Sequence, residues 1–403
     1  MNINFEALAK KYQTPYYVYD FNHITKQYQE LKGAFKARKS LISYAVKANS
    51  NLSVIKHLAN LGAGADCVSI GEVKRALKVG IAPYKIIFSG VGKTDDEIKQ
   101  ALEFDILMIN LESEAELGRV ETIAKELDKT ARISIRVNPN VDPKTHPYIS
   151  TGLHENKFGV DIDTAKRMYI KAKQSENLDP IGIHCHIGSQ LTELEPIKEA
   201  VNITANLVKN LAAALKIELK FFDVGGGLGI TYDNEKLIDT YEYGQAILSS
   251  LFGLDITVVC EPGRFIVGNS GTFVTKVLYE KVNGDKRFVI VDGAMNDLLR
   301  PSLYDAYHKV EVLGKTEDTS DCNVVGPICE SGDFFAKNIQ LPKTKHNDLI
   351  TIHSAGAYGF TMASNYNTRA KVAEIALENG QDRLIRRRET FEDLIAHEEE
   401  YIK

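Results

Sequence analysis

The chain lacks a hydrophobic run long enough to cross a membrane, and its N-terminus lacks an apolar signal-peptide core. A membrane-spanning helix needs about 20 mostly apolar residues, whereas charges already appear at Glu6, Lys10 and Lys11. A basic excess is also absent, because 49 Lys and Arg stand against 54 Asp and Glu. These absences argue against a membrane protein and a dedicated nucleic-acid binder, and we expect a cytoplasmic location.

Cysteine is scarce, with five residues in 403. An odd and sparse set cannot form the disulfide scaffold of a small secreted domain, so reduced thiols are expected. For four of the five, core packing is the default role. The fifth, Cys329, lies among polar and turn-forming residues, which favours a reactive thiol. The other four are Cys67, Cys185, Cys260 and Cys322.

What the sequence does contain is an alternation of short apolar runs with helical patterns over its first two thirds. Apolar residues make up 44% and charged residues 26%, which is typical of a globular protein. Eight β–α units in about 240 residues favour a closed parallel barrel over an open sheet. The expected strands are 41–46, 64–68, 85–88, 105–109, 132–137, 181–187, 220–224 and 256–260.

The remaining third is strand-rich and lacks long helices, which predicts an antiparallel β domain. Residues 16–19 also form a strand-like segment that we expect to join this domain. The predicted fold is therefore α/β, a (β/α)8 barrel over residues 24–264 with a discontinuous β domain made of residues 1–23 and 265–403. Further strands are expected at 273–279, 287–291, 310–313, 322–325 and 349–353.

Four chemically distinctive segments fall at the ends of predicted barrel strands, where barrel enzymes build their active sites. Lys47 follows the first strand, and His186 lies at the end of the sixth. The triglycine 225–227 follows the seventh strand and could bring backbone N–H groups close to an anion. Glu261 follows the eighth.

Nucleotide-binding motifs fit these segments poorly. In a dinucleotide fingerprint that starts at Gly225, the third glycine position is Ile230. The segment 89–94 resembles the end of a phosphate-binding loop, but the required earlier glycine would fall at Ile87. A nicotinamide-dependent dehydrogenase is therefore a distant alternative.

Each candidate side chain has an ordinary structural explanation beside the chemical one. An isolated lysine such as Lys47 is usually a surface or paired residue, but in a barrel mouth it can form a Schiff base. Glu261 could keep a cofactor ring nitrogen protonated or could pair with Arg264. His184 and His186 hint at metal, but no third ligand has suggestive spacing, so we expect no metal and favour stacking on a flat cofactor.

Taken together, these segments resemble the alanine-racemase-type (fold type III) pyridoxal-phosphate decarboxylases, and within that group the diaminopimelate decarboxylase family. The resemblance extends over nearly the whole chain, from Thr14 to Thr390. It is carried by the order and spacing of segments 44–49, 184–190, 225–227, 261–264, 326–333 and 355–359.

The resemblance implies that pyridoxal 5'-phosphate is the cofactor, and it assigns contacts to it. Lys47 corresponds to the lysine that bonds covalently to the cofactor, His186 to the stacking ring and Glu261 to the acid at the pyridine nitrogen. Asp66 corresponds to a position near the cofactor. The implied phosphate contacts are Ser189, Gly226, Gly227 and Tyr358.

The resemblance also implies a substrate and a homodimer with shared active sites. The reaction would be decarboxylation of meso-diaminopimelate to L-lysine at the last step of lysine biosynthesis. Cys329 corresponds to a thiol supplied by the second subunit, and either Cys329 or Lys47 would return the proton. The residues implied to hold the substrate are Arg264, Arg300, Tyr304, Glu330 and Tyr358.

Two rival functions remain open at this point. One is a decarboxylase of the same fold that acts on a polyamine precursor such as carboxynorspermidine, ornithine or arginine. Arg300 and Tyr304 argue against it, because such substrates offer no distal carboxylate to a buried guanidinium. The other is a cofactor-binding or regulatory homologue without catalysis, against which the presence of both Lys47 and Cys329 argues.

Overall fold

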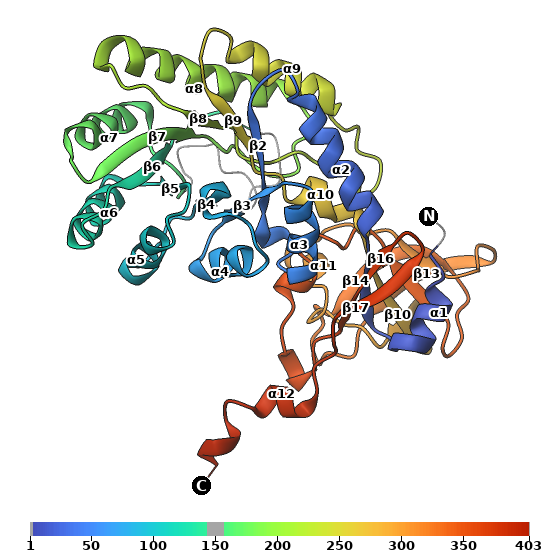
Figure 1. The fold of residues 1–403 in the computed structure, drawn as a ribbon. Coiled ribbons are helices and arrows are strands. Elements are labelled where there is room, and N and C mark those ends of the chain that lie inside the picture. Colours follow the sequence, from blue (N-terminus) through green and yellow to red (C-terminus); the bar gives the residue numbers. More distant parts are fainter. Residues whose placement is uncertain (1–2, 143–156, 403) are drawn as a thin grey trace. The chain divides into compact units, whose positions relative to one another are not determined.

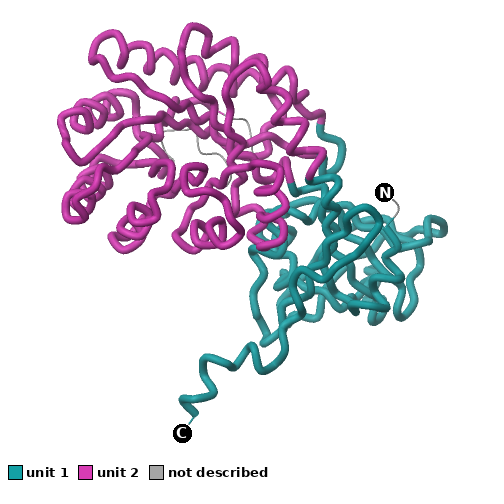
Figure 2. The backbone as a smooth tube through the Cα atoms, in the orientation of Figure 1, with its two compact units in different colours: residues 1–24, 231–235, 267–403 teal, residues 25–230, 236–266 magenta. Residues whose placement is uncertain are grey.

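The computed structural model describes residues 3–142 and 157–402. The chain forms two compact units, coloured separately in Figure 2. Unit 1 comprises residues 1–24, 231–235 and 267–403, and unit 2 comprises residues 25–230 and 236–266. Within the described ranges, no helix is both long enough and apolar enough to span a bilayer.

Unit 2 is a closed barrel of eight parallel strands, in which the last strand pairs with the first. In Figure 1 its helices lie outside the ring of strands. The predicted barrel is confirmed. Its strands are β2 (Ser40–Ala45), β3 (Gly64–Cys67), β4 (Ile86–Phe88), β5 (Met108–Leu111), β6 (Ala131–Arg136), β7 (Leu178–His184), β8 (Phe221–Asp223) and β9 (Thr257–Cys260).

The helices of this part begin where polar side chains cap their first turns. Thr94 and Glu97 form a reciprocal capping box at the start of α5, and Ser113 caps α6. The helices are α2 (Phe21–Ala34), α3 (Leu52–Asn60), α4 (Ile70–Lys78), α5 (Asp95–Glu103), α6 (Glu114–Glu126), α7 (Ile162–Gln174), α8 (Leu194–Leu215), α9 (Thr240–Ser250) and α10 (Arg264–Val267).

Side chains at alternate positions along the strands point inward and fill the barrel interior. Ile87, Met108, Ile181 and Val259 pack together from β4, β5, β7 and β9 as one buried cluster. The interior is therefore a packed core, as expected of a barrel of this size. Because all eight strands run in parallel, their carboxyl ends meet at one end of the barrel.

Unit 1 is built on a nine-stranded sheet. Its central path runs β14-β13-β11-β10-β1-β16-β17, and β15 pairs with both β10 and β12. The strands are β1 (Tyr16–Asp20), β10 (Gly271–Asn283), β11 (Lys286–Val291), β12 (Val310–Val312), β13 (Thr319–Val325), β14 (Phe334–Pro342), β15 (Leu349–Ile352), β16 (Ala373–Glu378) and β17 (Gln381–Arg386). The helices are α1 (Phe5–Tyr12), α11 (Arg300–Tyr304) and α12 (Phe391–Ile395).

This sheet is mainly antiparallel, as predicted, but two of its pairings are parallel and make it a mixed sheet. Strand β1 pairs antiparallel with β10 but parallel with β16, and β11 pairs parallel with β13. The reason is that β1 comes from the far end of the chain and is inserted between two strands. A strand inserted in this way is not bound to the antiparallel direction that a tight hairpin imposes.

Candidate active site

The four predicted segments all follow barrel strands in unit 2, as expected. Lys47 lies in a short 3-10 turn, Val46–Ala48, directly after β2. His186 lies two residues beyond β7, and Gly225 lies two residues beyond β8. Glu261 is the first residue after β9. The parallel barrel thus brings these groups to the same end although they are far apart in sequence.

Lys47 forms an ion pair with Asp66, which lies on β3. Lys47 Nζ is 3.1 Å from Asp66 Oδ2, and the Asp66 side chain is fully buried whereas that of Lys47 is 41% exposed. Burial raises the pKa of Asp66, and the nearby Glu261 adds to this, while the Lys47 ammonium opposes it. The lysine is therefore held by a carboxylate but keeps access to a reaction partner.

Glu261 is buried and still carries a charge. Burial is the largest single influence and raises its pKa, but His184, Asp223 and Lys47 together outweigh burial, and the pKa of Glu261 lies below its usual value. His184 Nε2 lies 3.3 Å from Glu261 Oε2, and both side chains are buried. An ionised carboxylate in this position can hold a positive charge on a bound ring.

The ring of His186 is neutral and held by its neighbours. Its Nδ1 accepts a hydrogen bond from the Gly226 N–H at 3.2 Å, and Arg136 Nη2 donates to its backbone oxygen at 3.4 Å. Burial lowers the pKa of His186 well below its usual value, and the charge of Arg136 lowers it further. A neutral ring fixed in this way is suited to stacking on a flat cofactor.

The triglycine is required by close packing as well as by its backbone angles. A Cβ at Gly226 would lie 2.2 Å from the backbone oxygen of Glu261. Gly227 has a φ of +109°, in the region that favours glycine. The loop after β8 therefore lies directly against the residue that follows β9.

Ser189 and Arg264 are joined by hydrogen bonds. The Ser189 hydroxyl accepts from Arg264 Nε at 3.3 Å and from Nη2 at 3.2 Å. Arg264 is buried. Ser189 thus lies beside a guanidinium group, a combination that suits binding of a phosphate or carboxylate.

The other predicted residues belong to unit 1. Arg300 begins α11 and is buried, with Nη1 2.9 Å from His308 Nε2. Cys329 is exposed, and its N–H donates to the Asn367 side chain at 3.1 Å. The remaining three residues are half-buried Tyr304, half-buried Tyr358 with a φ of 58°, and exposed Glu330, which accepts from the Tyr366 hydroxyl at 2.9 Å.

Sequence reasoning missed Asp223, and it gave His184 no role. Both lie at strand ends and are buried, and their side-chain atoms lie within 4.8 Å of one another and of a Glu261 oxygen. Spacing along the chain could not reveal this group, because its members come from β7, β8 and the end of β9. The available signal was a polar residue at the end of an otherwise apolar strand.

Comparisons with known proteins identify the family. The model of the pyridoxal-binding domain of pyridoxal-dependent decarboxylases matches residues 21–268. A diaminopimelate decarboxylase from Campylobacter jejuni is 62% identical over 402 residues, which cover 100% of both proteins. This chain belongs to the diaminopimelate decarboxylase family. The resemblance inferred from its motifs is thereby confirmed.

Solved structures agree with this assignment. The crystal structure of diaminopimelate decarboxylase from Helicobacter pylori, complexed with L-lysine, matches with a TM-score of 0.96 and 56% identity over 99% of this chain and 100% of that one. A lysine/ornithine decarboxylase from Vibrio vulnificus, complexed with putrescine, matches with a TM-score of 0.82 and 24% identity over 94% and 98%. At that identity the second likeness shows only a shared fold.

The residues present fit the cofactor of this family, pyridoxal phosphate. The cofactor offers an aldehyde to an amine, a ring nitrogen to a carboxylate and a phosphate to donors. Lys47, Glu261 and the pair of Ser189 with Arg264 supply these three kinds of partner. Asp66 Oδ1 is buried and has no hydrogen-bond donor among the described residues, which marks a place for an added polar group.

Proposed function

We propose that this chain catalyses the pyridoxal-phosphate-dependent decarboxylation of meso-2,6-diaminopimelate to L-lysine and carbon dioxide, at the last step of lysine biosynthesis. The main support for the proposal is the ion pair between Lys47 and Asp66. It lies in the same barrel as Glu261, which follows the last strand and is ionised. The Campylobacter jejuni relative named for this reaction, 62% identical over its full length, supports the choice of substrate.

The chemistry is divided between the cofactor and the chain. When bound, pyridoxal phosphate supplies a ring that accepts the electron pair released as carbon dioxide leaves. Lys47 would provide the amine that holds the cofactor covalently. Asp66 keeps that amine near its place, and Glu261 holds the positive charge at the ring nitrogen.

Other residues orient the cofactor. The ring of His186 would stack on the cofactor ring, and because it is neutral it would not disfavour a protonated cofactor ring. Ser189, Gly226, Gly227 and Tyr358 contact the phosphate in our proposal. The bonds from Arg264 fix the position of the Ser189 hydroxyl before the phosphate arrives.

The last chemical step is return of a proton to the carbon that lost carbon dioxide. Cys329 and Lys47 are the two acids that our proposal offers. Cys329 is exposed and is held at its backbone by Asn367, so its thiol is available to a second subunit. We propose a homodimer in which each site takes Cys329 from the partner, and a cytoplasmic location for the enzyme.

Recognition of the substrate rests on a second group of side chains. Arg300 presents a planar fork that matches the distal carboxylate of diaminopimelate. Its guanidinium lies over the Tyr232 ring, 4.8 Å from the centroid. The remaining proposed contacts to the substrate are Arg264, Tyr304, Glu330 and Tyr358.

A substrate panel tests the proposal. Carbon dioxide release is measured on meso-diaminopimelate, ornithine, arginine and carboxynorspermidine, each with and without added pyridoxal phosphate. We expect cofactor-dependent release from diaminopimelate, with the other three slower by orders of magnitude. Preferred turnover of a polyamine precursor would support the rival decarboxylase, and no turnover of any substrate by cofactor-loaded protein would support the non-catalytic homologue.

A further inference from the structure

Three buried titratable groups lie close together, and one of them is Glu261, the residue expected to contact the ring nitrogen of the cofactor. His184 ends β7, Asp223 ends β8 and Glu261 follows β9. Their exposed fractions are 2%, 0% and 6%, and one side-chain atom from each lies within 4.8 Å of the others. Water does not reach this group, so its charges must be balanced by the group itself.

The hydrogen bonds of the two carboxyl groups leave one oxygen of each without a donor. Asp223 Oδ1 accepts from the Gly225 N–H at 2.9 Å, and Glu261 Oε2 lies 3.3 Å from His184 Nε2. Asp223 Oδ2 and Glu261 Oε1 are buried, and no N–H or hydroxyl of the described residues reaches either of them. Two ionised carboxylates this close and this dry would repel each other strongly.

One proton placed between the two carboxyl groups removes both the charge repulsion and the lack of hydrogen-bond donors. It gives each orphan oxygen a hydrogen-bond partner and leaves a single negative charge on the pair. The structure favours Asp223 as its owner. His184 Nε2 lies within ion-pair distance of Glu261, whereas the hydrogen bond that Asp223 accepts comes from a neutral backbone N–H.

Electrostatics support this choice. Burial raises the pKa of Asp223 well above its usual value, and the charge of Glu261 raises it further. Burial raises the pKa of Glu261, but His184, the hydrogen bond from Asp223 and Lys47 together bring it below its usual value. The proton therefore stays on Asp223 while Glu261 remains charged.

We propose that Asp223 is a neutral carboxylic acid whose hydroxyl donates to Glu261, and that together with His184 it positions the charged carboxylate for the cofactor ring. A carboxylate has about four acceptor sites, so the Asp223 hydroxyl leaves room for the ring nitrogen. Asp223 also holds the Gly225 N–H, and thus connects the glycine loop to Glu261. In this proposal, only the interaction of Glu261 with the cofactor ring rests on the proposed function.

Two substitutions of Asp223 separate this role from simple packing. In Asp223→Asn, the amide oxygen can still accept from Gly225 and the amide NH2 can donate to Glu261, which reproduces the neutral acid. In Asp223→Ala both contacts are lost, and Glu261 is held by His184 alone. A hydrogen bond to a charged group is worth enough that its loss should weaken cofactor binding about 10- to 100-fold.

The first measurement is the infrared spectrum of the holoenzyme, taken as the difference between wild type and each variant. A protonated carboxyl group absorbs above the amide bands, whereas a carboxylate absorbs below them. We expect wild type minus Asp223→Asn to show the loss of a protonated carboxyl, and wild type minus Glu261→Gln to show the loss of a carboxylate. The opposite pattern in either spectrum would overturn the proposal.

The second measurement is titration of the cofactor-free protein with pyridoxal phosphate, followed by its visible spectrum. We expect Asp223→Asn to restore the affinity and spectrum that Asp223→Ala loses. Equal losses in both variants would overturn the positioning role. Neither measurement uses a substrate, so a protein that fails to decarboxylate diaminopimelate could still show the protonated Asp223. Failure of the proposed function is therefore distinguishable from failure of the proposal about Asp223.

Discussion

Glu261 keeps a negative charge in a buried site, and its position in the sequence does not reveal this. The charge depends on side chains from neighbouring strands, since burial by itself would neutralise the carboxyl group. Its replacement by an amide therefore isolates the electrostatic contribution, because the shape of the side chain changes little.

We predict that Glu261→Gln lowers turnover by about 100-fold or more, because a neutral amide cannot hold a positive charge at the ring nitrogen. Binding of pyridoxal phosphate should fall only modestly. Turnover number and cofactor affinity measured on the same preparation check this. Near-normal turnover with the cofactor fully bound would contradict the assigned role.

Arg300 is held by a histidine whose tautomer follows from simple chemistry. A guanidinium only donates, so His308 Nε2 must accept, and Nδ1 then carries the hydrogen that is donated to the His353 oxygen at 2.8 Å. In this tautomer His308 is neutral. It fixes the direction of the Arg300 fork without neutralising the positive charge that a substrate carboxylate needs.

Arg300→Ala should lower kcat/KM for diaminopimelate by roughly 30- to several-thousand-fold, the typical loss when one partner of a desolvated charge pair is removed. Amino acids without a distal carboxylate should lose little, since they do not use the contact. The matched control is His308→Gln, which keeps an acceptor near Arg300. If both substrate classes lose activity equally, Arg300 supports the fold and does not recognise the substrate.

At the level of elements, the barrel could be predicted from sequence more fully than the sheet of unit 1. Buried parallel strands are short apolar runs between helices, and all eight were placed close to their observed positions. The largest shifts are at β7, expected at 181–187 and found at Leu178–His184, and at β5, expected at 105–109 and found at Met108–Leu111. There Asp105 adopts a φ of 53°, and Arg132 binds the carbonyl oxygens of residues 105–107.

Three strands of unit 1 were missed, namely β14, β16 and β17. Strand β17 has the sequence QDRLIR and no fully buried residue, so it carries no apolar signal. The partners of Glu261 were missed for a different reason, because a contact between strands depends on barrel register. The predicted roles of Arg300 and Tyr358 came from family resemblance alone, since no local pattern singles these residues out. The neighbours of Cys329 indicated a reactive thiol, but its role in a shared site came from the resemblance.

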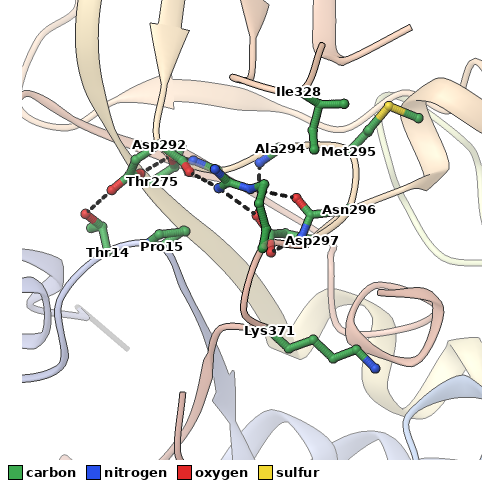
Figure 3. A network of polar contacts seen from close by, with 12 residues as sticks. Thr14, Pro15, Thr275, Asp292, Ala294, Met295, Asn296, Asp297, Ile328 and Lys371 are labelled. Carbon is green, nitrogen blue, oxygen red and sulfur yellow. Dashed lines mark hydrogen bonds and ion pairs between the residues drawn. The ribbon is translucent and has the colours of Figure 1, made fainter. Parts of the chain in front are cut away.

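A polar network in unit 1 makes the stability of this sheet dependent on pH. Figure 3 shows Asp292 between Thr14 and Thr275, and Asn296 beside Asp297. Burial raises the pKa of Asp297 to about 7, although Arg369 opposes the shift. Between about pH 4 and 7 the folded state therefore holds a proton that the unfolded state has released, and stability must fall as pH rises through this window.

Asp297→Asn should remove this pH dependence, because the amide stays neutral and can still accept from the Ala294 N–H, which donates to Asp297 Oδ2 at 3.0 Å. Melting temperatures of wild type and variant are compared at several values from pH 4 to 8. The stability of the variant relative to wild type should increase up to about pH 7 and then level off. A constant difference across the range would mean that Asp297 does not titrate there.

At the scale of the whole molecule, the proposed homodimer predicts that two inactive variants complement each other. Lys47→Ala and Cys329→Ala should each be nearly inactive. After random exchange of equal amounts, half of the dimers are mixed and each has one intact site, so about a quarter of wild-type activity should return.

The matched control mixes Lys47→Ala with Glu261→Gln. Both residues belong to unit 2, so every site in such a mixed dimer lacks one of them, and no recovery is expected. Equal recovery in the two mixtures, or none in the first after verified subunit exchange, would argue against a site shared between subunits.

The central claim is that pyridoxal phosphate is bound to Lys47 at the mouth of the barrel. The most direct test is reduction of the holoenzyme with borohydride, followed by proteolysis and mapping of the labelled peptide over the whole chain. We expect one label, on the peptide that contains Lys47, and no label on Lys47→Arg protein treated in the same way. A label on any other lysine of the wild-type chain would contradict the account.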